Sequence, residues 1–257
     1  MEYLLFRLYG PMASWGEIAV GEMRHSEAKP SKSALIGLLA AALGITREQE
    51  DQQQALATGY RFGIKMLSAG QVMRDYHTAQ APDSVGKFRY RTRRDELVVG
   101  RARLGTVLST REYRTDSQAV IALCATPEST WELEKLAEAL RQPHFHLYLG
   151  RKSCPLSAPL NPQIIIADGF RAALDGYQPG ELLCEEQAWK SDRRWLPDDE
   201  VSPYYWEGEV SDFAVADESF TPESVQQLRR HDQPISRSRW QFQPRAEYFW
   251  MNQREVG

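Results

Sequence analysis

Cysteine is scarce in this sequence of 257 residues: the three cysteines, at 124, 154 and 184, are far apart and form no Cys-x-x-Cys motif. This spacing excludes a disulfide framework and a zinc knuckle, and it fits a reducing compartment. Long apolar runs are also missing, because the first one, from Tyr3 to Phe6, is interrupted by Arg7. No window approaches the ~20 apolar residues of a membrane span. We therefore expect a cytoplasmic protein without a signal peptide and without a membrane partner.

The common catalytic motifs are absent as well. The sequence contains no GxSxG, P-loop, GxGxxG or HExxH pattern. His144 and His146 would share one face of a strand, but no third ligand accompanies them, so we interpret the pair as structural. The run 198–200 is interpreted as a solvated cluster of carboxylates. We predict no metal and no cofactor.

Neither sign of charge dominates the chain, whose formal net charge is -4, but the charges are unevenly distributed. The stretch 85–114 contains nine Lys and Arg against three Asp and Glu. The stretch 175–223 contains fourteen Asp and Glu against three Lys and Arg. A basic and an acidic block in a nearly neutral chain indicate two surfaces with different partners.

The apolar pattern of the first 150 residues predicts alternating strands and helices. One helix start is marked by Ser31 and its end by Gly44, and Ser129 with Glu132 forms a capping-box pattern for a second helix. The order is typical of an α+β, ferredoxin-like (RRM-like) βαββαβ domain, whose sheet often serves as an RNA platform. The predicted elements are strand 2–9, helix 31–43, strand 60–67, strand 119–125, helix 129–142 and strand 144–149.

We expect two parts in the chain. Residues 1–160 would form the RNA-binding domain, with an insertion at about 78–116. Residues 161–257 would form a β-rich C-terminal extension, with a strand at 164–166 and one or two closing strands near 239–251. Within the extension, the acidic stretch 189–225 lacks clean periodicity and is predicted to be irregular and only partly ordered.

The basic insertion predicts a projecting β-hairpin. In 87–93, strict alternation places Lys87, Arg89, Arg91 and Arg93 on one strand face, with Phe88 and Tyr90 on the other. The run 97–108 repeats this pattern with Arg101 and Arg103. Such an arm suits a nucleic acid, since one side is cationic and the other can stack on bases. The alternative is a solvated hairpin whose arginines face water.

A second candidate site follows the predicted strand at 144–149. There Gly150 is followed by two cations, a hydroxyl and a thiol, namely Arg151, Lys152, Ser153 and Cys154. A glycine turn exposes backbone N–H groups beside these charges, which would suit a phosphodiester. An ordinary exit from a strand into a loop is the alternative. Lys32, at the start of the first helix, could also face a phosphate.

The stretch Arg74-Asp75-Tyr76-His77 is the best candidate for catalysis. A His and a Tyr beside cations could deprotonate a ribose 2′-OH in metal-independent RNA cleavage. The alternative is a structural or RNA-contacting His77.

Four ordered blocks resemble the CasD family, the RNA-handle-binding subunits of type I-E CRISPR Cascade complexes in the RAMP superfamily. The similarity covers about residues 1–185 and returns weakly near 230–250, whereas the acidic stretch 189–225 departs from it. The blocks are Leu8-Tyr9-Gly10-Pro11-Met12-Ala13-Ser14-Trp15-Gly16, Pro30-Ser31-Lys32-Ser33-Ala34-Leu35-Ile36-Gly37-Leu38-Leu39, Arg74-Asp75-Tyr76-His77-Thr78 and Tyr148-Leu149-Gly150-Arg151-Lys152-Ser153-Cys154-Pro155-Leu156.

The resemblance implies a non-catalytic antiviral-defence subunit that grips the 5′ handle of the CRISPR RNA and caps the complex. Its partners would be the Cascade backbone subunit and the large subunit, with the hairpin, or thumb, close to target DNA. Because related subunits of another subtype cut repeat RNA, a metal-independent endoribonuclease remains the alternative. The predicted RNA contacts are Tyr148, Gly150, Arg151, Lys152, Ser153, Cys154, Arg89, Arg91, Arg101, Arg103, Trp15, Lys32, Tyr76 and His77.

Overall fold

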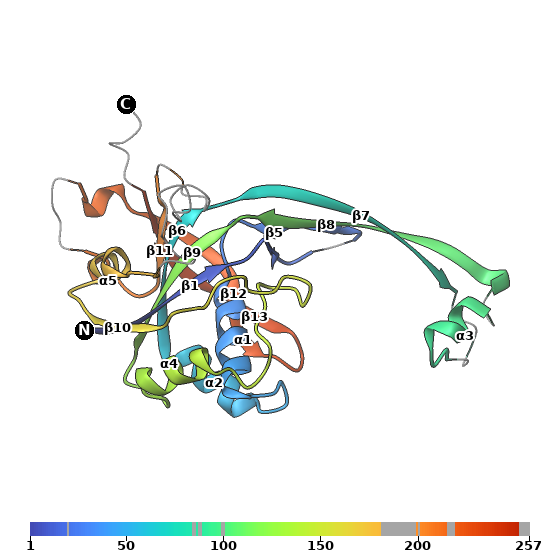
Figure 1. Cartoon of the computed structure of the whole chain (residues 1–257), viewed down its shortest axis with the longest axis horizontal. Helices are drawn as coiled ribbons and strands as arrows, with labels where there is room; N and C mark the ends of the chain where they lie inside the picture. Colours follow the sequence, from blue (N-terminus) through green and yellow to red (C-terminus); the bar gives the residue numbers. More distant parts are fainter. Residues whose placement is uncertain are drawn as a thin grey trace, which may run out of the picture.

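The centre of the molecule is one antiparallel seven-stranded sheet with the order β10-β1-β9-β6-β11-β13-β12 (Figure 1). The computed structural model describes residues 1–19, 21–83, 86, 89–98, 101–180, 199, 201–214 and 219–251. The strands of this sheet are β1 (Glu2–Tyr9), β6 (Tyr60–Ser68), β9 (Gln118–Ala125), β10 (Gln163–Ile166), β11 (Tyr204–Trp206), β12 (Gln226–Ser236) and β13 (Gln241–Trp250). The predicted α+β class is confirmed.

Both faces of the central strands are buried, which explains the continuous apolar run at the start of the chain. Leu4 and Phe6 of β1 pack into a core with α1 and α4. Tyr3 and Leu5, on the opposite face, pack into a second core around Phe170 of α5. The five α-helices of the described residues are α1 (Lys32–Leu43), α2 (Glu50–Thr58), α3 (Arg93–Val98), α4 (Leu133–Arg141) and α5 (Phe170–Gly176).

The first predicted helix is confirmed, together with both of its end signals. The Ser31 side chain accepts a hydrogen bond from the backbone N–H of Ala34 and caps α1. Gly44 ends the helix in the left-handed region, at φ 77°. This helix is therefore defined by local chemistry as well as by packing.

A long hairpin projects from the sheet (Figure 1). Its strands, β7 (Gln71–Pro82) and β8 (Leu104–Thr115), pair along their whole length. At ~3.3 Å per residue, twelve residues extend roughly 40 Å. Four short strands lie between β1 and α1, and two of them pair with β8: β2 (Met12–Ala13), β3 (Trp15–Gly16), β4 (Met23–Arg24) and β5 (Ser26–Glu27).

The tip of the hairpin differs from the prediction, because the expected strands at 87–93 and 97–108 are not formed as predicted. Arg93 begins α3, and β8 begins only at Leu104. The physical reason is a local cap: Thr92 Oγ1 accepts from the Asp95 N–H, and the Asp95 carboxylate accepts from the Thr92 N–H. This reciprocal pair starts a helix and overrides the strand-like alternation of cations. Lys87 and Phe88 lie outside the described residues.

The predicted strand at 144–149 is also wrong. The backbone N–H groups of His144 and Phe145 donate to the carbonyls of Ala42 and Ala41, at 3.0 and 3.1 Å. They therefore satisfy the last carbonyls of α1 instead of a strand partner. The strand that pairs with β1 on this side is β10, which confirms the strand predicted at 164–166.

The capping box predicted at Ser129 and Glu132 is not formed, and α4 begins at Leu133 without a side-chain cap. The Tyr60 hydroxyl accepts from the Trp131 N–H and donates to its carbonyl. This tertiary contact holds the preceding residues outside the helix.

Part of the acidic stretch 189–225 belongs to the sheet, contrary to the prediction that it is irregular. Residues 204–206 form β11 between β6 and β13. Tyr204 and Trp206 are buried, and their rings contact Phe213. The residues 189–198, 200 and 215–218 of the stretch lie outside the described residues. The sheet runs without a break from β1 to β13, across the boundary predicted at 160.

Candidate nucleic-acid interface

The basic turn after Tyr148 is a closed loop in close contact with the N-terminal segment. A bridge joins Tyr148 to Pro155, and the Leu149 N–H donates to the Cys154 carbonyl at 2.8 Å. Gly150 has φ 86°, and a Cβ there would lie 1.8 Å from the Ser14 carbonyl oxygen. Only glycine fits this approach, which the protein's own backbone makes. The turn predicted at Gly150 is present, whereas the expected ligand contact stays a prediction.

The side chains of the turn fall into two groups. Lys152 and Ser153 are exposed, and the Arg151 guanidinium lies 5.0 Å from the centroid of Tyr113, at the base of the hairpin. Arg151 Nη1 is buried and has no hydrogen-bond partner among the described residues. Cys154 is fully buried, and burial raises the pKa of its thiol. The structure thus makes Cys154 a core residue and not the RNA contact that was predicted.

Three of the predicted residues meet in one cavity. Trp15, Tyr148 and Gly150 line a cavity of ≈ 580 Å³ beside α1. Tyr148 is exposed, whereas Trp15 is only 5% exposed. A ring as buried as Trp15 can contact a ligand only within this cavity, so the structure does not make it an open stacking platform.

Lys32 has a different role from the one predicted. Its ammonium group is buried and donates to the Glu207 carboxylate at 2.8 Å. The Lys32 backbone N–H, at the N-terminus of α1, donates to Asp232 at 2.7 Å. Both donors are therefore used within the protein, and the phosphate contact predicted at this helix start is not supported.

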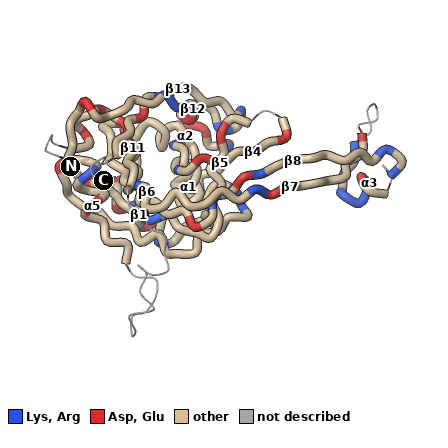
Figure 2. Tube along the Cα trace, turned by 90° about the horizontal axis from the view of Figure 1, so that it is seen from above, with Lys and Arg blue, Asp and Glu red and all other residues tan. Residues whose placement is uncertain are grey.

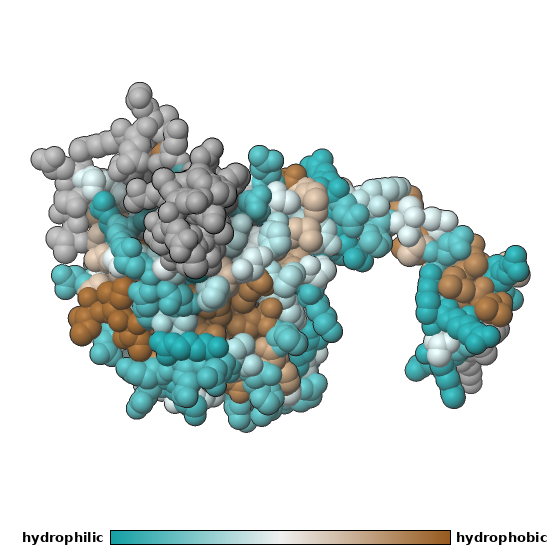
Figure 3. Space-filling model, viewed as in Figure 1, coloured by the Kyte–Doolittle hydropathy of each residue, from teal (hydrophilic) through white to brown (hydrophobic). Residues whose placement is uncertain are grey.

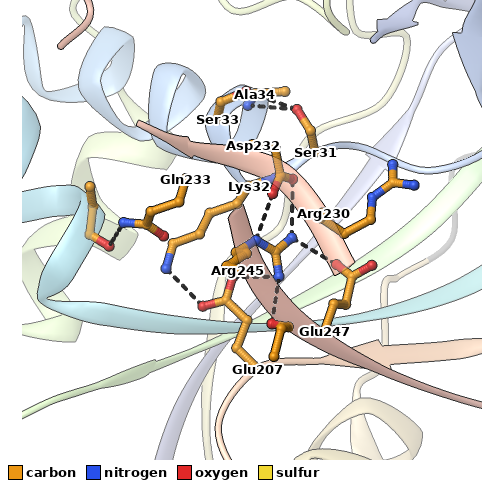
Figure 4. Close-up of polar contacts among 12 residues, drawn as sticks. Ser31, Lys32, Ser33, Ala34, Glu207, Arg230, Asp232, Gln233, Arg245 and Glu247 are labelled. Carbon is orange, nitrogen blue, oxygen red and sulfur yellow. Dashed lines mark hydrogen bonds and ion pairs between the residues drawn. The ribbon is translucent and has the colours of Figure 1, made fainter. Parts of the chain in front are cut away.

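Lys32 belongs to a buried network of three cations and three carboxylates that joins α1 to the C-terminal strands; Figure 4 labels all of its members except Lys29. At its centre, Arg245 bonds Asp232 at 2.7 Å and Glu247 at 2.8 Å, and it lies 3.3 Å from Glu207. Burial alone would lower the pKa of Arg245, but these carboxylates raise it. Burial alone would raise the pKa of Asp232, but the hydrogen bond with Arg245 outweighs burial, so the pKa of Asp232 is lowered. The members are Lys29, Lys32, Glu207, Asp232, Arg245 and Glu247.

The four predicted hairpin cations lie at its far end, separate from the turn at 148–154 (Figures 1 and 2). Arg89 and Arg91 are exposed outside regular structure, and Arg101 and Arg103 are exposed in a 3₁₀ helix. They surround the short helix α3, whose Leu97 and Val98 are exposed and give the tip a hydrophobic surface (Figure 3). The molecule therefore has two separate basic features.

Tyr76 and His77 are exposed side chains in the middle of β7. As neighbours on a strand they point to opposite faces. The His77 ring Nδ1 lies 2.9 Å from the Asp75 carboxylate, on its own face. One phosphodiester cannot lie against both side chains, so this arrangement does not favour the nuclease mechanism in which they act together.

Comparison with known proteins places the chain in a family. The family model described as CRISPR-associated protein (Cas_Cas5) matches residues 3–247. The Escherichia coli (strain K12) protein "CRISPR system Cascade subunit CasD" is 34% identical over 194 residues, which cover 72% of this chain and 81% of that protein. The chain belongs to the Cas5 family of CRISPR-associated proteins. The resemblance to CasD that the four sequence blocks indicated is confirmed.

Two solved structures share the fold of this Cas5 protein. "CRISPR RNA-guided surveillance complex" aligns with a TM-score of 0.62 at 21% identity, over 97% of this chain and 90% of the other. "Crystal structure of Cas protein" aligns with a TM-score of 0.56 at 23% identity, over 97% and 94% of the two chains. At these identities the likeness concerns the fold alone.

The described part of the Cas5 chain contains neither a membrane-spanning helix nor a cluster of metal ligands. Among the described residues, no helix has the length and apolar character needed to cross a membrane. No group of three or more His, Cys, Asp or Glu in the described part of the chain is arranged to hold a metal ion. His144 and His146 are not on a strand, and the His144 N–H donates to the Ala42 carbonyl near the end of α1.

The sequence analysis missed three residues that line the same cavity as Trp15 and Tyr148. Arg47 follows the end of α1, and Arg237 and Trp240 lie in the turn between β12 and β13. Trp240 was assigned to a closing strand, but β13 begins after it, at Gln241. The run Arg237-Ser238-Arg239-Trp240 mixes cations, a hydroxyl and an aromatic ring, much like the turn at 151–153, and this composition was the available signal.

Proposed function

We propose that this Cas5 protein is an RNA-binding subunit of a CRISPR Cascade complex, which grips the 5′ handle of the CRISPR RNA and does not cut it. The basic turn at 148–154 supports the proposal most directly. Lys152 is exposed, and Arg151 follows Gly150, which lines the cavity. The backbone of the turn approaches Ser14 so closely that only glycine fits at position 150. Charge-assisted hydrogen bonds from these two cations would hold handle phosphates.

The sheet supports a ferredoxin-like RNA-recognition domain. The adjacent strands β10, β1, β9 and β6, with α1 and α4 on one face, follow the order of a βαββαβ unit. Many such domains stack RNA on the opposite face of the sheet. Here that face is covered by α5 and the ring of Phe213. We therefore place the RNA at the turn and along the hairpin.

The hairpin would act as a thumb over the guide strand. Its exposed arginines suit a phosphate backbone, and the apolar surface of α3 suits a neighbouring protein. In a Cascade complex the neighbours would be the backbone subunit and the large subunit, with target DNA near the thumb. The division into a domain at 1–160 and an extension at 161–257 is part of the same proposal.

The double variant Arg151→Ala/Lys152→Ala tests the role of the turn. We expect it to lose assembly on tagged CRISPR RNA in a pull-down with the partner subunits, because it removes both cations of the turn. The control Lys135→Ala/Arg141→Ala removes the same charge from α4 and should assemble normally. Unchanged assembly of the turn variant would contradict the proposal.

The non-catalytic role has its own test. Purified protein is incubated with repeat RNA in EDTA, and we expect the RNA to stay intact. Cleavage that is lost in His77→Ala and blocked by a 2′-deoxy substitution at the cut would establish the endoribonuclease instead.

A further inference from the structure

The turn between β12 and β13 lines the same cavity as Trp15 and Tyr148. Trp240 in this turn has φ 55°, a left-handed conformation that is unusual for a bulky residue. Its ring is nevertheless 57% exposed. An exposed indole on a strained backbone is a candidate for ligand contact, because burial does not account for its position.

Two guanidinium groups lie against this indole. Arg47 is 4.7 Å and Arg237 is 5.7 Å from the ring centroid. Both contacts are cation–π interactions, which hold the ring and the two charges together. The cavity wall therefore combines one aromatic surface with two cations.

Arg237 is held tightly but is incompletely paired. Its Nη1 donates to the Ser33 carbonyl at 3.3 Å, and a Cβ on Gly37 would approach Nη2 to 2.8 Å. Its Nε is buried without a hydrogen-bond partner in the described part of the chain, and none of the described carboxylates forms an ion pair with it. Burial and the neighbouring Arg47 lower its pKa. A partly buried cation in these surroundings is stabilised by an anion.

Trp15, which lines the same cavity, contributes a second unpaired donor. Its side chain is 95% buried, and its Nε1 has no partner among the residues described. The cavity that these residues line has a volume of ≈ 580 Å³, within the ~300–1,000 Å³ of sites that hold small ligands. A fitting ligand would bring an anion, a flat aromatic ring and hydrogen-bond acceptors.

We propose that this cavity binds one unstacked nucleotide of single-stranded RNA, with its base on Trp240 and its phosphate at Arg237 and Arg47. This inference deepens the proposed function and rests on it. It adds a second RNA contact on the C-terminal extension, in a cavity that Tyr148 and Gly150 of the turn at 148–154 also line. The nucleotide held here would be pulled out of any helical stack, since the indole replaces its neighbouring base.

The test measures the affinity of the full chain for fluorescein-labelled single-stranded repeat RNA by fluorescence anisotropy. Trp240→Ala should weaken binding roughly 5- to 100-fold, the range of one base stacked on an aromatic ring. Trp240→Phe should restore most of the affinity. The matched control is Arg239→Ala, because Arg239 is an exposed neighbour in the same turn that does not line the cavity.

A scan with single abasic sites in the RNA identifies the bound nucleotide. At one position, the affinity of wild type for the abasic RNA should be as low as the affinity of Trp240→Ala for intact RNA. When the abasic RNA and Trp240→Ala are combined, the affinity should fall no further. Melting temperatures of all variants should match, since Trp240 is exposed. Equal losses for Trp240→Ala and Arg239→Ala, or no coupled position, would overturn the inference.

The two proposals can fail separately. If Arg151→Ala/Lys152→Ala loses RNA binding but Trp240→Ala does not, the role of the turn is supported and the nucleotide site in the cavity is contradicted. If only the cavity variants lose binding, the nucleotide site stands and the role of the turn fails. If wild type does not bind the RNA at all, both fail.

Discussion

The cations of the hairpin tip and those of the buried network have the same chemistry but opposite surroundings. Arg101 and Arg103 are exposed at the end of a two-stranded arm. Arg245 is enclosed by three carboxylates, and Lys29 and Lys32 are each paired with a glutamate. Among the described residues, no carboxylate forms an ion pair with Arg101 or Arg103, so their charges face solvent. The second group is occupied by its own protein and holds the C-terminal strands to α1.

This contrast shows that charge content alone does not identify a binding surface. Lys32 lies at a helix start that suggested phosphate binding, yet its ammonium group is buried and bonded to the Glu207 carboxylate. Removing one member of a buried pair leaves an uncompensated charge, whereas removing an exposed charge costs little stability. The predictions below use that difference.

The largest effect is expected for Arg245→Ala. The substitution leaves Glu207, Asp232 and Glu247 with two cations instead of three in a buried site. We expect the free energy of unfolding to fall by about 3–5 kcal/mol. Urea denaturation measures this, with Arg103→Ala as the control from the tip. A loss below about 1 kcal/mol would show that the network contributes little to the stability of the fold.

Asp232→Asn should have a smaller, pH-dependent effect. It weakens the bonds to Arg245 and to the Lys32 N–H, which predicts a loss of about 1.5–3 kcal/mol at pH 7. Because the folded pKa of Asp232 is lowered, its stabilising contribution is complete above the ordinary carboxyl pKa of ~3.9 and is lost as the pH falls through the folded value.

The measurement is urea denaturation of wild type and Asp232→Asn between pH 7 and pH 3. The difference between the two proteins should be constant at the upper end and shrink toward pH 3. A difference that grows as the pH falls would contradict the assignment of a charged, paired Asp232.

The smallest effect on stability is expected for Arg101→Ala/Arg103→Ala, within about 0.5 kcal/mol of wild type. RNA binding should nevertheless become less sensitive to salt. The slope of log affinity against log salt should fall by ~0.7 for each lost phosphate contact with a single strand. An unchanged slope would mean that these arginines are simply solvated.

Much of the fold could be predicted because local signals and packing agree. Ser31 and Gly44 mark the ends of α1, and unbroken apolar runs mark β1 and β9. At the hairpin tip the error was local, because the reciprocal cap of Thr92 and Asp95 competes with the strand-like alternation of cations. Two other errors arose where a distant group decided the structure. The Tyr60 hydroxyl displaced the cap expected at Ser129, and the end of α1 took the N–H groups of the strand expected after Pro143.

The candidate site was predicted less completely. Gly150 was correctly assigned to a turn, but the close approach that requires glycine is made by the Ser14 carbonyl and was not predicted. Lys152 is exposed, and its contact with RNA stays a prediction. The cavity beside it could not be derived, because its walls are more than 80 residues apart in the chain. Only the fold brings Arg237 and Trp240 to the same cavity as Tyr148.

The β7–β8 arm has a consequence for how the protein would meet its partners. Beyond the pairing of β2 with Arg114 and Thr115 and of β4 with Thr110 and Arg111, its strands have no third strand among the described residues. A ribbon of two strands is marginally stable in water. Its outer amides should therefore exchange with deuterated solvent far faster than those of β1 or β9. Binding of a partner would order this ribbon. Part of the interaction free energy would offset the conformational entropy lost on ordering, which makes the binding of the arm easier to reverse.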